Sequence, residues 1–371
     1  MELNSYMPAK LITGRGCVRA AGKELAKLGR VCLIVTGRTA ARESGALKDV
    51  TDTLEQNGQR WLHFDGIGQN PRLTDCMAAA EMAIAGGADF ILGIGGGSPL
   101  DAAKCVAVLA ANPGMTQEQL YGFRWANAPL KIVAVGTTAG TGSEVTKVSV
   151  ITTPDGRKKS FHHEAIFPAL ALGDPAYTMS LPPMITRSTA VDVLAHCAES
   201  FFSRSANHLS RCYAVEGIRL LLEVFRERAE TTWEDLSYED REKLYCASIY
   251  GGLAINVTGT CFPHTMGYLL TERFGIPHGT ACAAFQKEFY QYNKSVVPGL
   301  TGEFLERIRC GEEEYLTLLA RVTPPWEVHM DEALIAGSHS RWVGNGSMAK
   351  CQGEFTPEMA DEVLRRNFSG K

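Results

Sequence analysis

The sequence predicts an α/β domain with a parallel sheet, followed by an all-α domain. In the first half of the 371 residues, short β-branched runs alternate with alanine-rich stretches of helical composition, as in parallel βαβ units. Beyond about Asp174, strand-like runs become scarce and apolar residues recur at helical spacing. A length of 371 residues also suits two domains of roughly 100 to 200 residues each. We therefore expect an α/β domain over residues 1–178 and a helical domain over residues 179–371.

Three near-continuous apolar runs have the pattern of strands that are buried on both faces of a sheet. They are residues 31–36, 90–94 and 131–135. Residues 77–85 and 102–110 have helical composition, and glycines or prolines separate each of them from a strand. This succession predicts a doubly wound sheet.

Helical spacing dominates the second half. Apolar residues recur every three or four positions over residues 214–225, 239–255 and 358–367. Prolines interrupt the chain over residues 174–183, where we expect the domain boundary.

Composition and charge exclude several classes of protein. Lys and Arg number 37 against 41 Asp and Glu, so the net charge of −4 argues against a nucleic-acid partner or an acidic membrane surface. Hydrophobic residues at 45% are typical of a globular protein rather than a disordered one. The eleven cysteines form no CxxC pair, the first ten residues lack the apolar core of a signal peptide, and no apolar run reaches about 18 residues. We therefore expect a cytoplasmic protein with reduced thiols and no membrane partner.

Glycine-rich loops follow two of the predicted strands. Residues 95–101 (GGGSPLD) lead from a strand into a helix, where backbone N–H groups and the helix N-terminus favour a phosphate. Residues 137–144 (TTAGTGSE) follow the next predicted strand, and loops on neighbouring strands are suited to hold a pyrophosphate and its ribose. The alternatives are a tight turn in the first case and a hydroxyl-rich helix cap in the second. The first loop matches neither GxGxxG nor GxxxxGK[ST].

Four residues of the second half indicate a metal site. Asp192 and His196 lie four apart in a helical stretch, so both side chains project from one face. Together with His264 and His278 they supply three imidazoles and a carboxylate, which fit a divalent transition metal with open coordination positions. Such pairs also arise by chance, and spacing does not establish that the four converge. The other histidines are interpreted as surface or structural residues: His63, His162, His163, His208, His329 and His339.

Taken together, five segments resemble the iron-dependent (group III) alcohol dehydrogenases. They are GGGSPLDAAK at 95–104, GTTAGTGSEVT at 136–146, DPAYTMSLPP at 174–183, AVDVLAH at 190–196 and GIPHG at 275–279. The similarity runs in order over residues 11–368. It is greatest to the shorter members of the family, which include 1,3-propanediol dehydrogenases.

The resemblance implies a dehydroquinate-synthase-like fold, with a nucleotide-binding domain, a helical metal- and substrate-binding domain, and a cleft between them. The pyrophosphate-binding residues that it implies are Gly96, Gly97, Ser98 and Asp101. The second cofactor loop would contribute Thr137, Thr138 and Thr141, and Lys159 would lie near the ribose. The metal ligands that it implies are Asp192, His196, His264 and His278. The family metal is Fe(II), although Zn(II) suits the same ligands, and family members form homo-oligomers.

One position departs from the family pattern. Many members have a further histidine four positions after the third ligand, where this chain has Tyr268. Because the ordinary pKa of tyrosine is near 10, a histidine proton relay is in doubt here. A proton would leave through water, a ribose hydroxyl or Tyr268.

The end of the first predicted strand bears on the choice of cofactor. NAD-selective relatives often carry a carboxylate there, which binds the ribose 2′-hydroxyl and repels a 2′-phosphate. This chain has Gly37 and Arg38, so NADP(H) is favoured over NAD(H), unless Arg38 is a solvated loop residue.

The resulting hypothesis is an enzyme that interconverts a small primary alcohol or diol and its aldehyde, with the metal as Lewis acid. A metal-dependent lyase resembling dehydroquinate synthase and a non-catalytic nucleotide or metal sensor are the alternatives. Cys351 and Asn70 are further candidates for the substrate and cofactor sites, although packing and an Asn-Pro turn explain them equally well.

Overall fold

The computed structural model describes residues 3–369, which form two compact units. One unit contains residues 7–181 and 236–245, and the other contains residues 3–6, 182–235 and 246–369. Residues 3–6 and residues 236–245 are therefore each assigned, by their contacts, to a different unit from the residues next to them in the sequence. The domain boundary between residues 178 and 179 stays a prediction.

The first unit is built on a six-stranded parallel sheet with the strand order β1-β8-β5-β4-β2-β3. The strands are β1 Lys10–Thr13, β2 Val31–Thr36, β3 Arg60–Phe64, β4 Phe90–Gly95, β5 Lys131–Gly136 and β8 Leu170–Gly173. The three apolar runs predicted as strands are β2, β4 and β5, which lie side by side in the sheet. Their near-complete burial explains why their sequences lack polar alternation.

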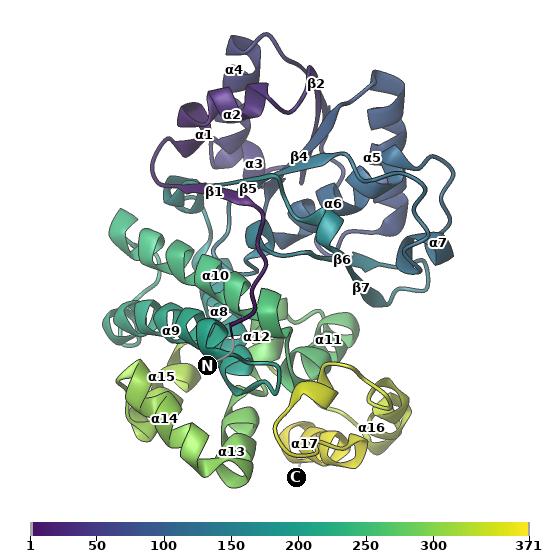
Figure 1. Ribbon diagram of the computed structural model, residues 1–371. Coiled ribbons are helices and arrows are strands. Elements are labelled where there is room, and N and C mark those ends of the chain that lie inside the picture. The colour runs from purple at the N-terminus through teal and green to yellow at the C-terminus, as the bar shows by residue number, and fades with distance from the viewer. Residues whose placement is uncertain (1–2, 370–371) are drawn as a thin grey trace. The chain divides into compact units, whose positions relative to one another are not determined.

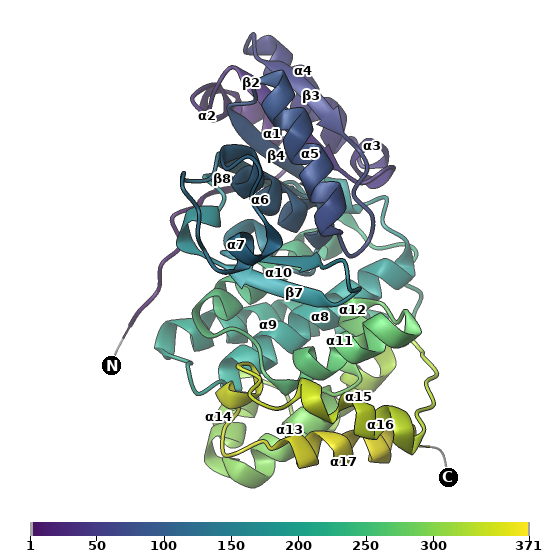
Figure 2. The ribbon, with the colours of Figure 1, turned by 90° about the vertical axis from the view of Figure 1, so that its right-hand side faces the viewer.

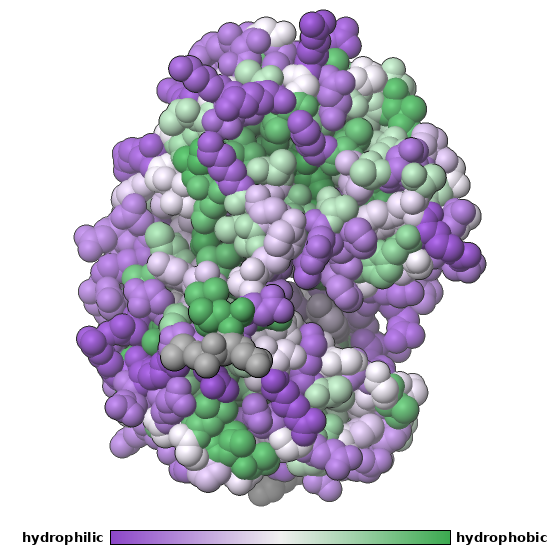
Figure 3. All heavy atoms as spheres, viewed as in Figure 1, coloured by the Kyte–Doolittle hydropathy of each residue, from purple (hydrophilic) through white to green (hydrophobic). Residues whose placement is uncertain are grey.

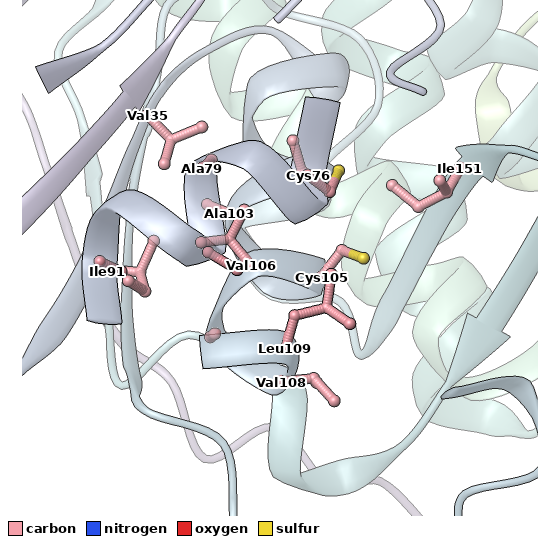
Figure 4. Close-up of a cluster of buried hydrophobic side chains, with 14 of the residues drawn as sticks. Val35, Cys76, Ala79, Ile91, Ala103, Cys105, Val106, Val108, Leu109 and Ile151 are labelled. Carbon is pink, nitrogen blue, oxygen red and sulfur yellow. The ribbon is translucent and has the colours of Figure 1, made fainter. Parts of the chain in front are cut away.

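Helices cover both faces of this sheet, as a doubly wound fold requires. They are α1 Cys17–Ala20, α2 Gly22–Ala26, α3 Ala40–Glu43, α4 Ala46–Gln56, α5 Leu73–Gly86, α6 Gly97–Ala111 and α7 Gln117–Tyr121. Along β2, Leu33 and Val35 pack with α5 and α6, whereas Cys32 and Ile34 pack with α1, α2 and α4 on the opposite face. Figure 1 shows these two groups of helices on either side of the sheet, and Figure 4 shows side chains of α5 and α6 that fill one face.

An antiparallel hairpin stands apart from the sheet. It consists of β6 Val148–Thr152 and β7 Lys158–His162. Short 3-10 helices complete the first unit: η1 Ser143–Val145, η2 Glu164–Ile166 and η3 Pro175–Thr178.

The second unit is helical, and its described residues include no strand. Its α-helices are α8 Pro183–Phe202, α9 His208–Arg228, α11 Phe262–Phe274, α12 His278–Ala283, α13 Gln286–Val296, α14 Pro298–Ile308, α15 Glu312–Val322, α16 Glu332–Ser338 and α17 Pro357–Phe368. Two 3-10 helices, η4 His339–Arg341 and η5 Met348–Lys350, also belong to it, and α10 Tyr238–Thr258 contributes residues to both units. Helix α8 is central, because α9, α11 and α12 all pack against it (Figures 1 and 2).

Hydrophilic side chains are abundant on the face shown in Figure 3, where they surround several groups of hydrophobic side chains. Within residues 3–369, no helix combines the length and apolar character needed to cross a bilayer.

Candidate functional site

Helix α8 carries two of the four predicted metal ligands in the interior of the second unit. Asp192 and His196 are buried, and Glu199 is fully buried one turn further along. Positions 192, 196 and 199 follow the i, i+4, i+7 spacing, which brings the three side chains to one face of the helix. The face of α8 that carries them is therefore polar although it is buried.

Two helix starts supply the remaining predicted ligands. His264 lies in the first turn of α11, and His278 is the first residue of α12, directly after Pro277. A Cβ added at Gly279 would lie 1.9 Å from the carbonyl oxygen of Ser188 on α8. The glycine of the Pro-His-Gly segment therefore permits the close approach of α12 to α8 that brings His278 beside Asp192.

The four predicted ligands converge on one carboxylate oxygen. Oδ1 of Asp192 lies 3.5 Å from Nε2 of His264 and 4.0 Å from Nε2 of both His196 and His278. The rings of His196 and His264 stack with centroids 4.7 Å apart. Helix α8 and the pair α11 and α12, which begins 60 residues after α8 ends, thus bring the residues together as the metal hypothesis requires.

The chemistry of this cluster fits a metal ion. Within the described part of the chain, neither Oδ1 of Asp192 nor Nε2 of His264 makes a hydrogen bond of ordinary geometry, although both atoms are buried. Buried polar atoms are normally satisfied, so a cluster of such acceptors suggests a cation as the missing partner. One carboxylate with three imidazoles is a donor set suited to divalent transition metals.

Charge in the cluster shifts two pKa values. Burial alone would raise the pKa of the Asp192 carboxyl, but the three surrounding imidazoles outweigh it and hold this pKa below its usual range. Burial alone would lower the pKa of His264, but three neighbouring acidic side chains raise it well above its usual range. The surroundings therefore favour the ionised carboxylate and the presence of positive charge beside it.

A residue that sequence reasoning missed also borders the cluster. Cys282 lies one helical turn after His278, and its sulfur is 3.7 Å from Nδ1 of that histidine. One potential ligand atom each from Asp192, His264, His278 and Cys282 lie within 4.8 Å of one another, a set that does not include His196. Burial raises the pKa of the Cys282 thiol to about 11. The His-x3-Cys spacing at the start of α12 could have indicated from the sequence that Cys282 lies beside His278.

Tyr268 lies beside the cluster. It is half-buried on α11, one turn after His264, and its ring stacks on that of His278 with centroids 5.3 Å apart. The ring is therefore next to a predicted ligand.

In the first unit, the two glycine-rich loops meet. They follow β4 and β5, which are adjacent and pair Gly95 with Gly136 at their carboxyl ends. A Cβ at Gly96 would lie 2.9 Å from Oγ1 of Thr138, and one at Gly97 would lie 2.7 Å from Cγ2 of Thr141. These two glycines thus allow the threonines of the second loop to approach the first.

The loop surface leaves polar groups available for a ligand. Helix α6 begins at Gly97 without a side-chain cap, and Oγ1 of the buried Thr137 has no hydrogen-bond partner among the described residues. Asp101 differs, because its carboxylate accepts bonds from Oγ of Ser143 at 2.6 Å and from N of Val150 at 2.9 Å. Its predicted part in cofactor binding stays a prediction.

Beside the first loop lies a cavity of about 490 Å³. It is lined by Arg38, residues 66–70, Arg72 and Asp75. Asn70 has a left-handed φ of 58°, and its N–H donates to Oγ of Ser98 at 3.2 Å. This bond connects the cavity wall to the glycine-rich loop and brings Asn70 close to the predicted cofactor residues. The sequence did not distinguish Arg72, because nothing in its local sequence sets it apart from the many other arginines.

Other sequence-predicted residues lie elsewhere. Gly37 directly follows β2 and precedes Arg38. Lys159 is exposed on β7, with its ammonium 4.3 Å from the ring centroid of Tyr121. Cys351 is buried directly after η5. The roles of these residues stay predictions.

Two histidines interpreted as structural have partners. Nε2 of His63 lies 2.9 Å from Oγ1 of Thr36, and Nδ1 of His339 lies 2.7 Å from the Asp361 carboxylate. These contacts agree with the structural interpretation.

Comparisons with known proteins give one consistent result. A family model described as iron-containing alcohol dehydrogenase matches residues 8–175, and one described as the C-terminal part of the Fe-containing alcohol dehydrogenase family matches residues 186–317. The 1,3-propanediol dehydrogenase of Citrobacter freundii is 30% identical over 302 residues, which cover 79% of this chain and 74% of that protein.

Solved structures agree with these matches. The crystal structure of an iron-containing alcohol dehydrogenase from Thermotoga maritima superposes with a TM-score of 0.91 at 30% identity, over 98% of this chain and 99% of that one. The sulfoacetaldehyde reductase of Bifidobacterium kashiwanohense, in complex with NAD+, gives a TM-score of 0.87 at 28% identity over 100% of both chains. The neighbours have the dehydroquinate-synthase-like fold, so the predicted fold class is confirmed.

Proposed function

The chain belongs to the iron-containing alcohol dehydrogenase family, and from this premise we propose that it transfers hydride between a nicotinamide cofactor and a small primary alcohol or diol, or the corresponding aldehyde. The relatives include a diol dehydrogenase and an aldehyde reductase, which supports this substrate class.

The observation that carries the proposal is the convergence of three imidazoles on Oδ1 of Asp192 in a buried site. We assign Asp192, His196, His264 and His278 as the metal ligands. A divalent metal held there supplies a Lewis acid for the substrate oxygen. We propose Fe(II) as the native metal because of the family, while the nitrogen-rich donor set also suits Zn(II).

Tyr268, which lies next to the ligands, has two roles in this proposal. Tyr268 covers one face of the His278 ring and thereby restricts its orientation. Its hydroxyl is our candidate to carry the alcohol proton, with water and a cofactor ribose hydroxyl as the other routes.

For the cofactor, we propose that the two adjoining loops of the first unit bind the pyrophosphate. Gly96, Gly97 and Ser98 offer the uncapped start of α6, and Thr137 offers a buried hydroxyl. Thr138 and Thr141 form the opposite wall.

We further propose that NADP(H) is preferred over NAD(H). Arg38 and Arg72 line the same cavity, and neither guanidinium forms an ion pair with a described residue. Two such groups suit a 2′-phosphate, which accepts charge-assisted hydrogen bonds. Asp75 in the cavity wall opposes this preference in part.

Turnover after metal replacement tests the proposed activity. Protein stripped of metal and reloaded anaerobically with Fe(II) or Zn(II) should oxidise NADPH with short aldehydes, whereas metal-free protein and Asp192→Asn should not. Asp361→Asn is the matched control, because it alters a buried carboxylate that also contacts a histidine in the second unit. Absence of turnover with either metal, despite tight cofactor binding, would favour the non-catalytic alternative.

Cofactor preference is tested separately. We expect NADPH to exceed NADH in kcat/KM by at least about tenfold, a difference of ~1.4 kcal/mol. Arg38→Ala and Arg72→Ala should each reduce this ratio. Arg19→Ala, which removes an exposed arginine paired with Asp49, should leave it unchanged. A wild-type preference for NADH would refute the cofactor argument and leave the dehydrogenase proposal standing.

The predicted cytoplasmic location and homo-oligomeric state stay predictions.

A further inference from the structure

Glu199 is a buried carboxylate to which the proposed reaction gives no role. It lies on α8 with no solvent exposure. Its Oε1 accepts hydrogen bonds from Nδ1 of His264 at 2.7 Å and from Nε2 of Gln286 at 2.9 Å. Its Oε2 accepts one from the backbone N–H of Cys261 at 2.7 Å. Three donors from α11, α13 and the residue before α11 thus surround one carboxylate.

The charge of Glu199 has an unusual environment. Among the described residues, no lysine or arginine forms an ion pair with this carboxylate. A buried carboxylate is costly unless charge and hydrogen bonds compensate it. The His264 imidazole, which can carry positive charge, contacts this carboxylate. A cation bound at Nε2 of His264, on the side of the ring opposite Glu199, would further compensate the negative charge of the carboxylate.

The contact also determines which nitrogen of His264 carries the proton. An ionised carboxylate only accepts hydrogen bonds, so Nδ1 of His264 must donate its proton to Glu199. In the neutral ring, Nε2 then carries the free lone pair. That atom lies 3.5 Å from Oδ1 of Asp192, on the side of the predicted metal ligands.

We propose that Glu199 is a positioning residue for the metal site: it holds His264 in the tautomer and orientation that offer Nε2 to the metal. The inference rests on the proposed function only in taking His264 as a ligand. Carboxylates that accept the second N–H of a metal-bound histidine raise its basicity and fix its ring, and their loss typically lowers metal affinity ~10–100-fold.

Metal affinity of Glu199→Gln tests the proposal. The amide keeps one acceptor oxygen, but its NH₂ group must face one of the three donors, so the Nδ1–H tautomer is no longer enforced. Titration of metal-free protein with Zn²⁺ against a chromophoric chelator should show a Kd at least about tenfold above wild type. With Co²⁺ as probe, the visible absorption band should change position or intensity, because the geometry of a ligand changes.

Asp361→Asn is the matched control for this variant. Asp361 is a buried carboxylate of the same unit, and it accepts from Nδ1 of His339 at the same 2.7 Å. We expect this control to lower the thermal unfolding midpoint while the Zn²⁺ Kd stays within about twofold of wild type. An unchanged Kd in Glu199→Gln, or an equal loss of affinity in both variants, would overturn the proposal, because a purely structural role would give either result.

A measurement on the wild-type chain keeps the proposal testable if Glu199→Gln fails to fold. In ¹⁵N-histidine spectra of Zn²⁺-loaded protein, with the His264 signals assigned by their loss in His264→Asn, the ring should show a protonated Nδ1 and an unprotonated, metal-bound Nε2. A ring protonated on Nε2 alone would overturn the proposal. Tight Zn²⁺ binding, together with no turnover after loading with either Zn(II) or Fe(II), would instead refute the proposed function and leave the role of Glu199 intact.

Discussion

Replacement of Lys104 by methionine should loosen the second glycine-rich loop. Lys104 is fully buried on α6. Its ammonium donates to the carbonyl oxygens of Ser143 at 2.8 Å and Val148 at 2.7 Å, and to Oγ of Ser143 at 2.7 Å. Oγ1 of Thr146 lies at 3.3 Å and the carboxylate of Asp101 at 3.8 Å. One side chain therefore fixes residues 143–148 to the helix that begins at the first loop.

The expected magnitude follows from these contacts. Methionine has a similar length but no donors, so two carbonyl groups lose a charged partner and Asp101 loses the nearest cation. Breaking a buried charged network by removing one partner costs ~3–5 kcal/mol. For a unit of this size, each 1 kcal/mol lowers the unfolding midpoint by roughly 2–4 °C, so we expect a decrease of at least about 6 °C. Because residues 137–144 belong to the proposed cofactor site, the Kd for NADPH should also rise.

Circular dichroism melting and NADPH fluorescence titration measure these two effects. Lys48→Met is the matched control, because it makes the same chemical change at an exposed lysine paired with Asp52 on α4. Its expected effect is below ~1 kcal/mol. If Lys104→Met melts within about 2 °C of Lys48→Met, the argument from the buried hydrogen bonds is wrong.

Three further expectations concern pH, loop contact and proton transfer. Burial lowers the pKa of Lys104 to about 8, so the unfolded chain binds more protons than the folded chain between about pH 8 and 10.5. The free energy of unfolding should therefore rise with pH through this window, by up to ~3 kcal/mol relative to Lys104→Met, as measured by urea unfolding. Gly97→Ala should raise the Kd for NADPH at least about tenfold, because its Cβ would meet Thr141 at 2.7 Å. Gly22→Ala, which gains only an ordinary contact at 3.4 Å, should leave that Kd unchanged. Tyr268→Phe should lower kcat ~10²-fold and change the pH–rate profile; an unchanged profile would assign the proton to water or the ribose.

Much of the fold was predictable because burial leaves a direct pattern in the sequence. Strands β2, β4 and β5 are buried on both faces, so their apolar runs stood out with nearly correct ends. Strands β1 and β8 have only four residues each, and β7 carries mostly exposed polar residues, so neither length nor periodicity distinguished them. Residues 236–245 belong to the first unit by their contacts, and no feature of their sequence predicted this.

The sequence by itself determined the fold class, the two loops and the identity of the candidate ligands, because motif spacing and hydrophobic pattern are local properties. The tertiary structure decided that Asp192, His196, His264 and His278 meet at one carboxylate oxygen. It also revealed the buried carboxylate of Glu199 behind His264. These contacts join residues up to 86 positions apart, and their distances depend on how closely helices pack rather than on spacing along the chain.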